Sequence, residues 1–139
     1  GTSVALSDLT IRDGFSAAGN GGGIELRGEK LSLNFSRINM TDNRLGVLRE
    51  QDAGAGVAVY AGTGSRLTVT DSSFSGNVAA PYGRGGAIAA NGATVVIRGT
   101  VLERNAAMDG GAIAVSDSSL TLERSTPTLS PGELQRLGR

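Results

Sequence analysis

Short runs in which apolar and polar residues alternate recur along most of the chain. One set of runs starts with two apolar residues spaced two apart, at 24–27, 57–60, 88–91 and 113–116. A second set has the same spacing, at 9–12, 31–34, 67–70, 95–98 and 120–123. Each run is too short for a helix, and apolar residues at every second position indicate a strand with one face buried. We therefore expect the apolar residues of both sets to point into a common core.

The runs belong to a repeat of three elements in a fixed order. The first element begins with glycine and reads GGGI at 21–24, GAGV at 54–57, GGAI at 85–88 and GGAI at 110–113. The third element is an apolar residue, two variable positions and Asn, as MTDN at 40–43, FSGN at 74–77 and LERN at 102–105. Repeats of this length are typical of solenoids and propellers. Propeller blades are longer, about 40–45 residues, and carry signatures that are missing here.

Three short strands per coil of about 25 residues predict an all-β, right-handed parallel β-helix, in which equivalent strands stack about 4.8 Å apart. We expect about four to five coils over residues 1–125, with loops at 44–53, 78–84 and 106–109. Aligning the second set of runs by their first apolar residue places Phe35 in one column with Asp13, Asp71, Gly99 and Arg124.

Residues 126–139 depart from the repeat. Ser130 fits a helix N-cap, Pro131 the first helical position and Glu133 the acid of a capping box. A short helical cap over the last coil is one interpretation, because solenoids need to cover their terminal core. A tail without such a role is the alternative.

The composition excludes several kinds of site. The chain has no Cys and no His, so thiol nucleophiles, Ser–His triads and Cys- or His-ligated metals are excluded from these residues. Thirteen basic and thirteen acidic residues balance, whereas a nucleic-acid binder would carry a basic excess. No stretch approaches the roughly 20 apolar residues of a membrane-spanning helix. We expect no metal, no cofactor, no nucleic-acid partner and no membrane-spanning segment in this chain.

Glycine and asparagine at the repeat positions predict structural roles. Glycine makes up 22 of 139 residues, and the pairs Gly85–Gly86 and Gly110–Gly111 precede a strand, where a sharp turn needs positive φ or close backbone approach. The Asn of the third element tolerates a left-handed conformation and can hydrogen-bond in stacks along a β ladder. The predicted ladder consists of Asn43, Asn77 and Asn105.

The outward positions are candidates for contact with a partner. On the first set of runs, Ala58, Ala89 and Ala114 form an apolar column that predicts an interface. Tyr60 and Asn91 lie in the neighbouring outward column, and Tyr82 and Arg84 lie in one of the predicted loops. Insertions in solenoids often gather on the binding side, so these four residues are candidate binding residues.

An enzyme needs a polar constellation on one face, and the best available is Asp71, Arg98 and Glu123 on three successive coils. Glycoside hydrolysis requires two carboxyl groups at a set separation, and general acid–base catalysis near neutrality often uses His. No two acids stack on adjacent coils in the predicted alignment, and His is absent. A surface ion pair is the simpler interpretation of these three residues.

The intact GGAI at 85–88 and 110–113, together with FSGN at 74–77, resembles the GGAI/FxxN repeats of bacterial polymorphic outer-membrane proteins. This resemblance to cell-surface and autotransporter passenger repeats covers about residues 4–125, in degenerate form in the earlier coils. It implies an extracellular or cell-surface location, adhesin-like relatives, and protein or polysaccharide partners.

The combined expectation is a non-enzymatic β-helical scaffold or binding domain, as a fragment or subunit of something larger. Further coils or another subunit would then pair with its open ends. A pectin-lyase-like enzyme fragment and a structural subunit that packs through the alanine column are the alternatives.

Overall fold

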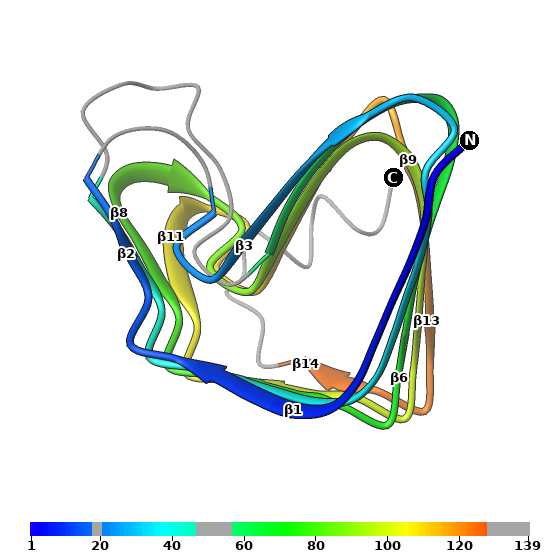
Figure 1. Ribbon diagram of the computed structural model, residues 1–139. Coiled ribbons are helices and arrows are strands. Elements are labelled where there is room, and N and C mark those ends of the chain that lie inside the picture. Colours follow the sequence, from blue (N-terminus) through cyan, green and yellow to red (C-terminus); the bar gives the residue numbers. More distant parts are fainter. Residues whose placement is uncertain (18–20, 47–56, 128–139) are drawn as a thin grey trace.

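The structure is a computed structural model that describes residues 1–17, 21–46 and 57–127, without the side chains of 58–63, 80–82 and 126–127. These residues form a right-handed parallel β-helix, as predicted, and no helix occurs in them. Seen along the axis, the chain runs clockwise as it recedes from the N-terminal coil (Figure 1). About three turns are described, slightly fewer than the four to five predicted.

Each coil has four walls rather than the three strands predicted, and the walls enclose an angular outline with unequal sides (Figure 1). The first wall stacks the N-terminal half of β1 on β4, then the C-terminal half of β6, then β9 and β13. These strands span Ser3–Arg12, Ser32–Thr41, Val57–Thr70, Ile88–Arg98 and Ser119–Glu123.

The second wall continues from the C-terminal halves of β1 and β4 into shorter strands, which are β7 (Ser73–Ser75), β10 (Val101–Glu103) and β14 (Thr126–Pro127). The third wall is a separate four-stranded sheet of β2 (Phe15–Ser16), β5 (Arg44–Gly46), β8 (Val78–Arg84) and β11 (Ala106–Asp109). The fourth wall contains β3 (Ile24–Gly28), the N-terminal parts of β6 and β9, and β12 (Ile113–Ser116).

The third wall corrects the prediction that the segments after each Asn are loops. Leu45 and Ala79 stack in register and are buried, so one inward residue per coil is enough to hold these short strands. A single inward residue leaves no visible alternation in the sequence, which explains why the period-two pattern missed them.

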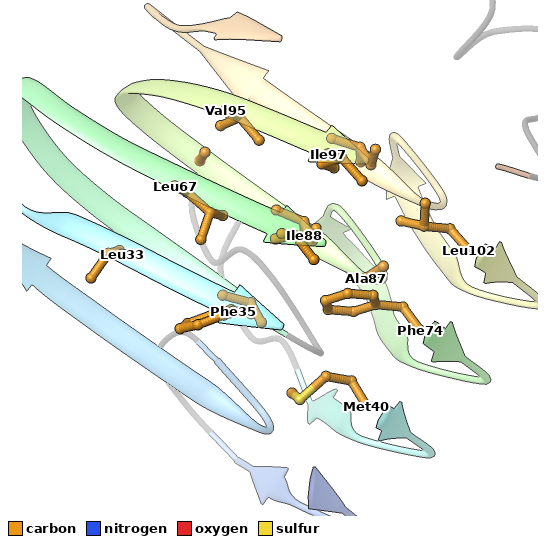
Figure 2. Packing of buried hydrophobic residues seen from close by; sticks show 14 of the residues in the cluster. Leu33, Phe35, Met40, Leu67, Phe74, Ala87, Ile88, Val95, Ile97 and Leu102 are labelled. Carbon is orange, nitrogen blue, oxygen red and sulfur yellow. The ribbon is translucent and has the colours of Figure 1, made fainter. Parts of the chain in front are cut away.

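The core is a set of apolar columns, each with one side chain per coil. Met40, Phe74 and Leu102 stack in one column, and Leu33, Leu67 and Val95 stack in another (Figure 2). The predicted inward positions are confirmed where the structure describes them. Burying a side chain of this size stabilises the fold by about 1.5–3 kcal/mol.

The register differs from the predicted alignment in the first two coils. The run at 9–12 pairs with 38–41 on the second wall, and the run at 31–34 is displaced by two residues against β6. Leu33 pairs with Leu67 and Phe35 with Val69, so Phe35 lies in the core, 1% exposed, and is not in one column with Asp71. A slip of two residues keeps every side chain on the same face of a strand, so the alternation alone cannot detect it.

Turns between walls use a left-handed residue in the same place in successive coils. The corner between the first and second walls, called the first corner, has positive φ at Asp8, Arg37, Asp71, Gly99 and Arg124. The turn into the fourth wall uses Gly85 and Gly110, both with φ near +60°. At Gly86 a Cβ would overlap backbone atoms of Gly111 and Ala106, so the next coil can approach closely there.

β14 extends the solenoid register to Pro127 by pairing with β10. Residues 128–139, which include the predicted helical cap, lie outside the described residues. The boundary between the β-helix at 1–125 and the cap or tail at 126–139 therefore stays a prediction.

Candidate functional site

The structure places the three repeated Asn side chains in one stacked column at the start of the third wall. Asn77 Oδ1 accepts hydrogen bonds from the backbone N–H of Asn43 at 3.1 Å and from its Nδ2 at 2.9 Å. Asn105 Oδ1 accepts the same two bonds from Asn77, at 3.1 and 2.9 Å. Asn43 and Asn77 are fully buried. The column is polar but internal, so its hydrogen bonds connect coils rather than face solvent.

Each Asn also donates to a backbone carbonyl of the preceding coil. Asn77 Nδ2 lies 3.0 Å from the carbonyl oxygen of Met40, and Asn105 Nδ2 lies 2.9 Å from that of Phe74. The first coil has Gly14 at this position, and its N–H donates to Asn43 Oδ1 at 3.0 Å. One Asn side chain per coil therefore hydrogen-bonds the backbone groups that, because of the turn, have no partner in the ladder of hydrogen bonds between strands.

Two further ladders, built from hydroxyl groups, were not predicted. At the first corner, the N–H of Ile38 donates to Ser72 Oγ, that of Ser72 to Thr100 Oγ1, and that of Thr100 to Ser125 Oγ. At the turn between the fourth and first walls, Ser65 and Ser118 accept from Leu31 and Ala93 in the same way.

The signal for the first hydroxyl ladder was present in the sequence. The runs that start at 67, 95 and 120 all end in Ser or Thr, at Ser72, Thr100 and Ser125. Their common position predicts a shared role, in the same way as the Asn column. Every buried side-chain N or O atom in the described residues has a hydrogen-bond partner.

Of the three residues considered for catalysis, the structure brings two into direct contact. Arg98 Nε lies 2.7 Å from Glu123 Oε2, and both side chains are more than one third exposed. This hydrogen bond lowers the pKa of Glu123 and raises that of Arg98. Asp71 lies at the first corner, in line with Gly99 rather than Arg98. The lowered pKa favours the charged form of Glu123, whereas a general acid at neutral pH needs a raised one.

The first corner also carries an ion pair that the sequence alignment missed. Arg37 Nε lies 2.5 Å from Asp8 Oδ1, and its Nη2 lies 2.7 Å from Asp8 Oδ2. The hydrogen bond from Arg37 lowers the pKa of Asp8, and the nearby charge of Asp71 adds to the effect of Asp8 in raising the pKa of Arg37. The register of β1 against β4 brings these two residues into one column.

The four candidate binding residues fall on two walls. Tyr60 and Asn91 are paired in register on the fourth wall, and Asn91 is exposed. Tyr82 and Arg84 belong to β8 on the third wall, where Arg84 Nε lies 3.6 Å from Asp109 Oδ2. The side chains of Tyr60 and Tyr82 lie outside the described set, so no contact is assigned to them.

The alanine column is in register, and its central residue, Ala89, is buried within the chain. Ala58, Ala89 and Ala114 pair successively on the fourth wall, as the repeat predicts. Ala89 is 5% exposed within this chain and Ala114 is half-buried. The expectation of an exposed apolar strip is therefore wrong at its centre.

Exposed apolar side chains occur elsewhere, mainly on the third wall. Phe15 is 68% exposed on β2 and Met108 is 59% exposed on β11. Among the described residues no group of three or more acidic side chains is placed to hold a metal ion. No helix capable of crossing a membrane occurs in that part of the chain.

Comparison with known protein families finds a match in the region that contains the complete motifs FSGN at 74–77 and GGAI at 85–88. Residues 71–91 match the Chlamydia polymorphic membrane protein repeat. The match runs from β7 through β8 into β9 and includes Phe74 of the core, Asn77 of the ladder and Gly85 of the turn. No curated protein and no solved structure matches the chain.

The repeat and the parallel β-helix together confirm the resemblance to polymorphic outer-membrane-protein repeats. They indicate a β-helical protein of the outer membrane or cell surface. The match covers the residues that turn and stack the coil, so it identifies the architecture and leaves the ligand open.

Proposed function

We propose that the chain is a non-enzymatic β-helical scaffold of a bacterial cell-surface protein, with outward side chains that contact an extracellular protein or polysaccharide. The observation that carries the proposal is the division between inward and outward positions. Stacking depends on the buried Asn and hydroxyl ladders and on the apolar columns, which repeat from coil to coil. The outward residues take no part in these ladders, so they are free to specify a partner.

The repeat match supports the cell-surface location, and adhesin-like or autotransporter relatives belong to the same proposal. The partner surface is formed by the exposed residues of the third and fourth walls, with Arg84 and Asn91 at its described part. An ion pair such as Arg84–Asp109 contributes about 0–1 kcal/mol to folding when exposed. Its guanidinium can therefore be recruited by a partner at little cost in stability.

Binding of the intact chain to bacterial and host surface polysaccharides and to host-cell surface proteins tests this proposal. We expect saturable binding that Arg84→Ala and Asn91→Ala weaken, with unchanged unfolding midpoints. Asn39→Ala is the matched control, because Asn39 is exposed on the second wall, away from Arg84 and Asn91. Equal loss of binding in all three variants, or no binding by the wild type, would contradict the proposal.

The contact between Arg98 and Glu123 supports a second candidate, a polysaccharide lyase. Arg98 would stabilise negative charge on a uronate, and cleavage would produce unsaturated ends that absorb in the near ultraviolet. Arg98→Ala should abolish that absorbance change, whereas the scaffold proposal predicts no turnover by the wild type. The assay therefore separates the two candidates.

A structural subunit that packs through the alanine column is a third candidate. Ala89 is too buried for a clean test, since a charge there would disturb folding. Ala114→Glu is the better variant, because Ala114 is half-buried. Loss of assembly with retained β structure would support this candidate.

A further inference from the structure

An Asn-Gly pair lies within β9, at the turn between the fourth and first walls. Asn91 is exposed at the end of the fourth-wall part of this strand, and Gly92 follows it with a φ of +76°. The equivalent residue of the next coil, Asp117, is also left-handed, with a φ of +48°. The turn therefore keeps one backbone shape in both coils, and in the coil of β9 a glycine that follows Asn provides it.

Strand pairing is interrupted at Gly92 on both sides. In β6, residues 61–64 stand against this single glycine, between the pairs that Asn91 and Ala93 form. Toward the next coil, pairing stops at Asn91 and resumes at Thr94. Segments that few ladder hydrogen bonds hold open locally at low free energy. The backbone between Asn91 and Gly92 can therefore rotate without disrupting the strands on either side.

An Asn followed by Gly carries both reactants of an intramolecular condensation. A base removes the proton of the Gly92 N–H, and this nitrogen attacks the side-chain carbonyl carbon Cγ of Asn91. The new C–N bond closes a five-membered succinimide, and the side-chain nitrogen leaves as ammonia. Water then adds to either carbonyl and breaks one C–N bond of the ring, which gives aspartate or isoaspartate. Glycine favours closure, because it has no Cβ to obstruct the ring and tolerates unusual backbone angles.

We propose that Asn91 is a site of spontaneous deamidation in the folded protein, with water as the co-reactant. The reaction replaces a neutral amide, which donates and accepts hydrogen bonds, by a carboxylate that only accepts them. It adds a negative charge to the fourth wall, and the isoaspartate product also lengthens the main chain by one carbon at the turn. The proposal goes beyond the scaffold role, and its failure would leave that role intact.

Two other exposed Asn residues provide a contrast inside the same chain. Asn34 and Asn39 lie on the outward faces of the first and second walls. Each is followed by a buried residue, Phe35 or Met40, which pairs with the neighbouring coil. Closure of a ring there would have to move a core side chain out of its column and break its strand pairing. We therefore expect Asn34 and Asn39 to stay unmodified while Asn91 reacts.

Peptide mapping by mass spectrometry tests the proposal on the folded 139-residue chain after incubation at mildly alkaline pH. Cleavage after Arg and Lys places Asn91 in fragment 85–98 and Asn34 in fragment 31–37. Asn20, which also precedes glycine, lies outside the described residues and falls in another fragment. We expect the fragment with Asn91 to gain the mass of an amide-to-acid change, as two separable products, and the fragment with Asn34 to stay unchanged.

The rate of the reaction decides whether the folded turn itself reacts. A free peptide with the sequence of 85–98 is the reference, since no fold restrains it. We expect the folded chain to react at Asn91 within about tenfold of the peptide rate, because local opening of such a turn needs little free energy. An unmodified Asn91 in the folded chain, under conditions that convert the free peptide, would overturn the proposal.

Two variants assign the reaction to this site and to the folded state. Asn91→Gln, whose longer side chain would have to close a six-membered ring, should abolish the change of mass in 85–98. Asn77→Ala removes buried hydrogen bonds of the Asn column and should accelerate any reaction that passes through global unfolding. We expect the rate at Asn91 in this variant to equal that of the wild type. Urea below the unfolding transition provides the same test without a substitution. A rate that rises in step with the loss of stability would place the reaction in the unfolded chain and refute the proposal.

Discussion

Replacing Asn77 by Ala tests whether the buried Asn column holds the coils together. The substitution removes four hydrogen bonds, two accepted by Oδ1 from Asn43 and two donated by Nδ2, to the Met40 carbonyl and to Asn105 Oδ1. The N–H of Asn43 then lacks this acceptor in a fully buried setting. Each buried polar group left without a partner costs about 1–3 kcal/mol.

Two such groups, the Asn43 N–H and the Met40 carbonyl, give an expected loss of about 3 kcal/mol in the free energy of unfolding. Urea unfolding followed by circular dichroism measures this loss. With a slope of about 1–3 kcal/mol/M, the midpoint should fall by about 1–3 M while the slope stays the same. An unchanged slope matters, because repeat proteins can lose cooperativity between coils.

The matched control is Asn39→Ala, which truncates an exposed Asn of the neighbouring coil. Asn39 Oδ1 accepts a hydrogen bond from Ser73 Oγ at 2.9 Å on the solvent side. We expect its unfolding free energy to change by no more than about 0.5 kcal/mol. A loss below about 0.5 kcal/mol for Asn77→Ala, or one equal to that of the control, would refute the ladder as a source of stability.

Three more predictions follow from the ladders, the turns and the corner charges. Thr100→Val keeps the shape of a fully buried residue but leaves a backbone N–H of the preceding coil without its acceptor, so we expect a loss of about 1–3 kcal/mol in urea unfolding. Gly86→Ala should prevent native folding, seen as loss of the native circular dichroism spectrum, because its Cβ would overlap backbone atoms. Gly64→Ala is the control, since there is room for a Cβ there and the variant should lose only about 1–2 kcal/mol of stability through the strain of its positive φ. The hydrogen bond from Arg37 holds the pKa of Asp8 below its usual value, so Asp8 contributes stability that is present above pH 3.8 and is lost as the pH falls through the lowered pKa. Asp8→Asn should therefore weaken the fall of the unfolding free energy at acid pH. An unchanged acid dependence of the unfolding free energy would contradict the ion pair.

The residue pattern alone determined the fold class. Alternating apolar residues, a repeat of 25–33 residues and glycine before the first run of each repeat are local properties of the chain, and each agrees with a parallel β-helix. The stacking of Asn43, Asn77 and Asn105 could also be predicted, since a recurring residue at a recurring turn has few places to lie. The Ser72–Thr100–Ser125 ladder could have been predicted by the same reasoning.

Tertiary structure alone decided the register and the surroundings of each outward residue. The alternation of a strand has a period of two, so a two-residue slip leaves the pattern unchanged, and packing of Phe35 against Val69 was needed to choose between alignments. The ion pair of Asp8 with Arg37 depends on the register of β1 against β4, and the burial of Ala89 depends on the path of the fourth wall. Periodicity records which face of a strand is buried, whereas the neighbour across the ladder depends on how whole coils stack.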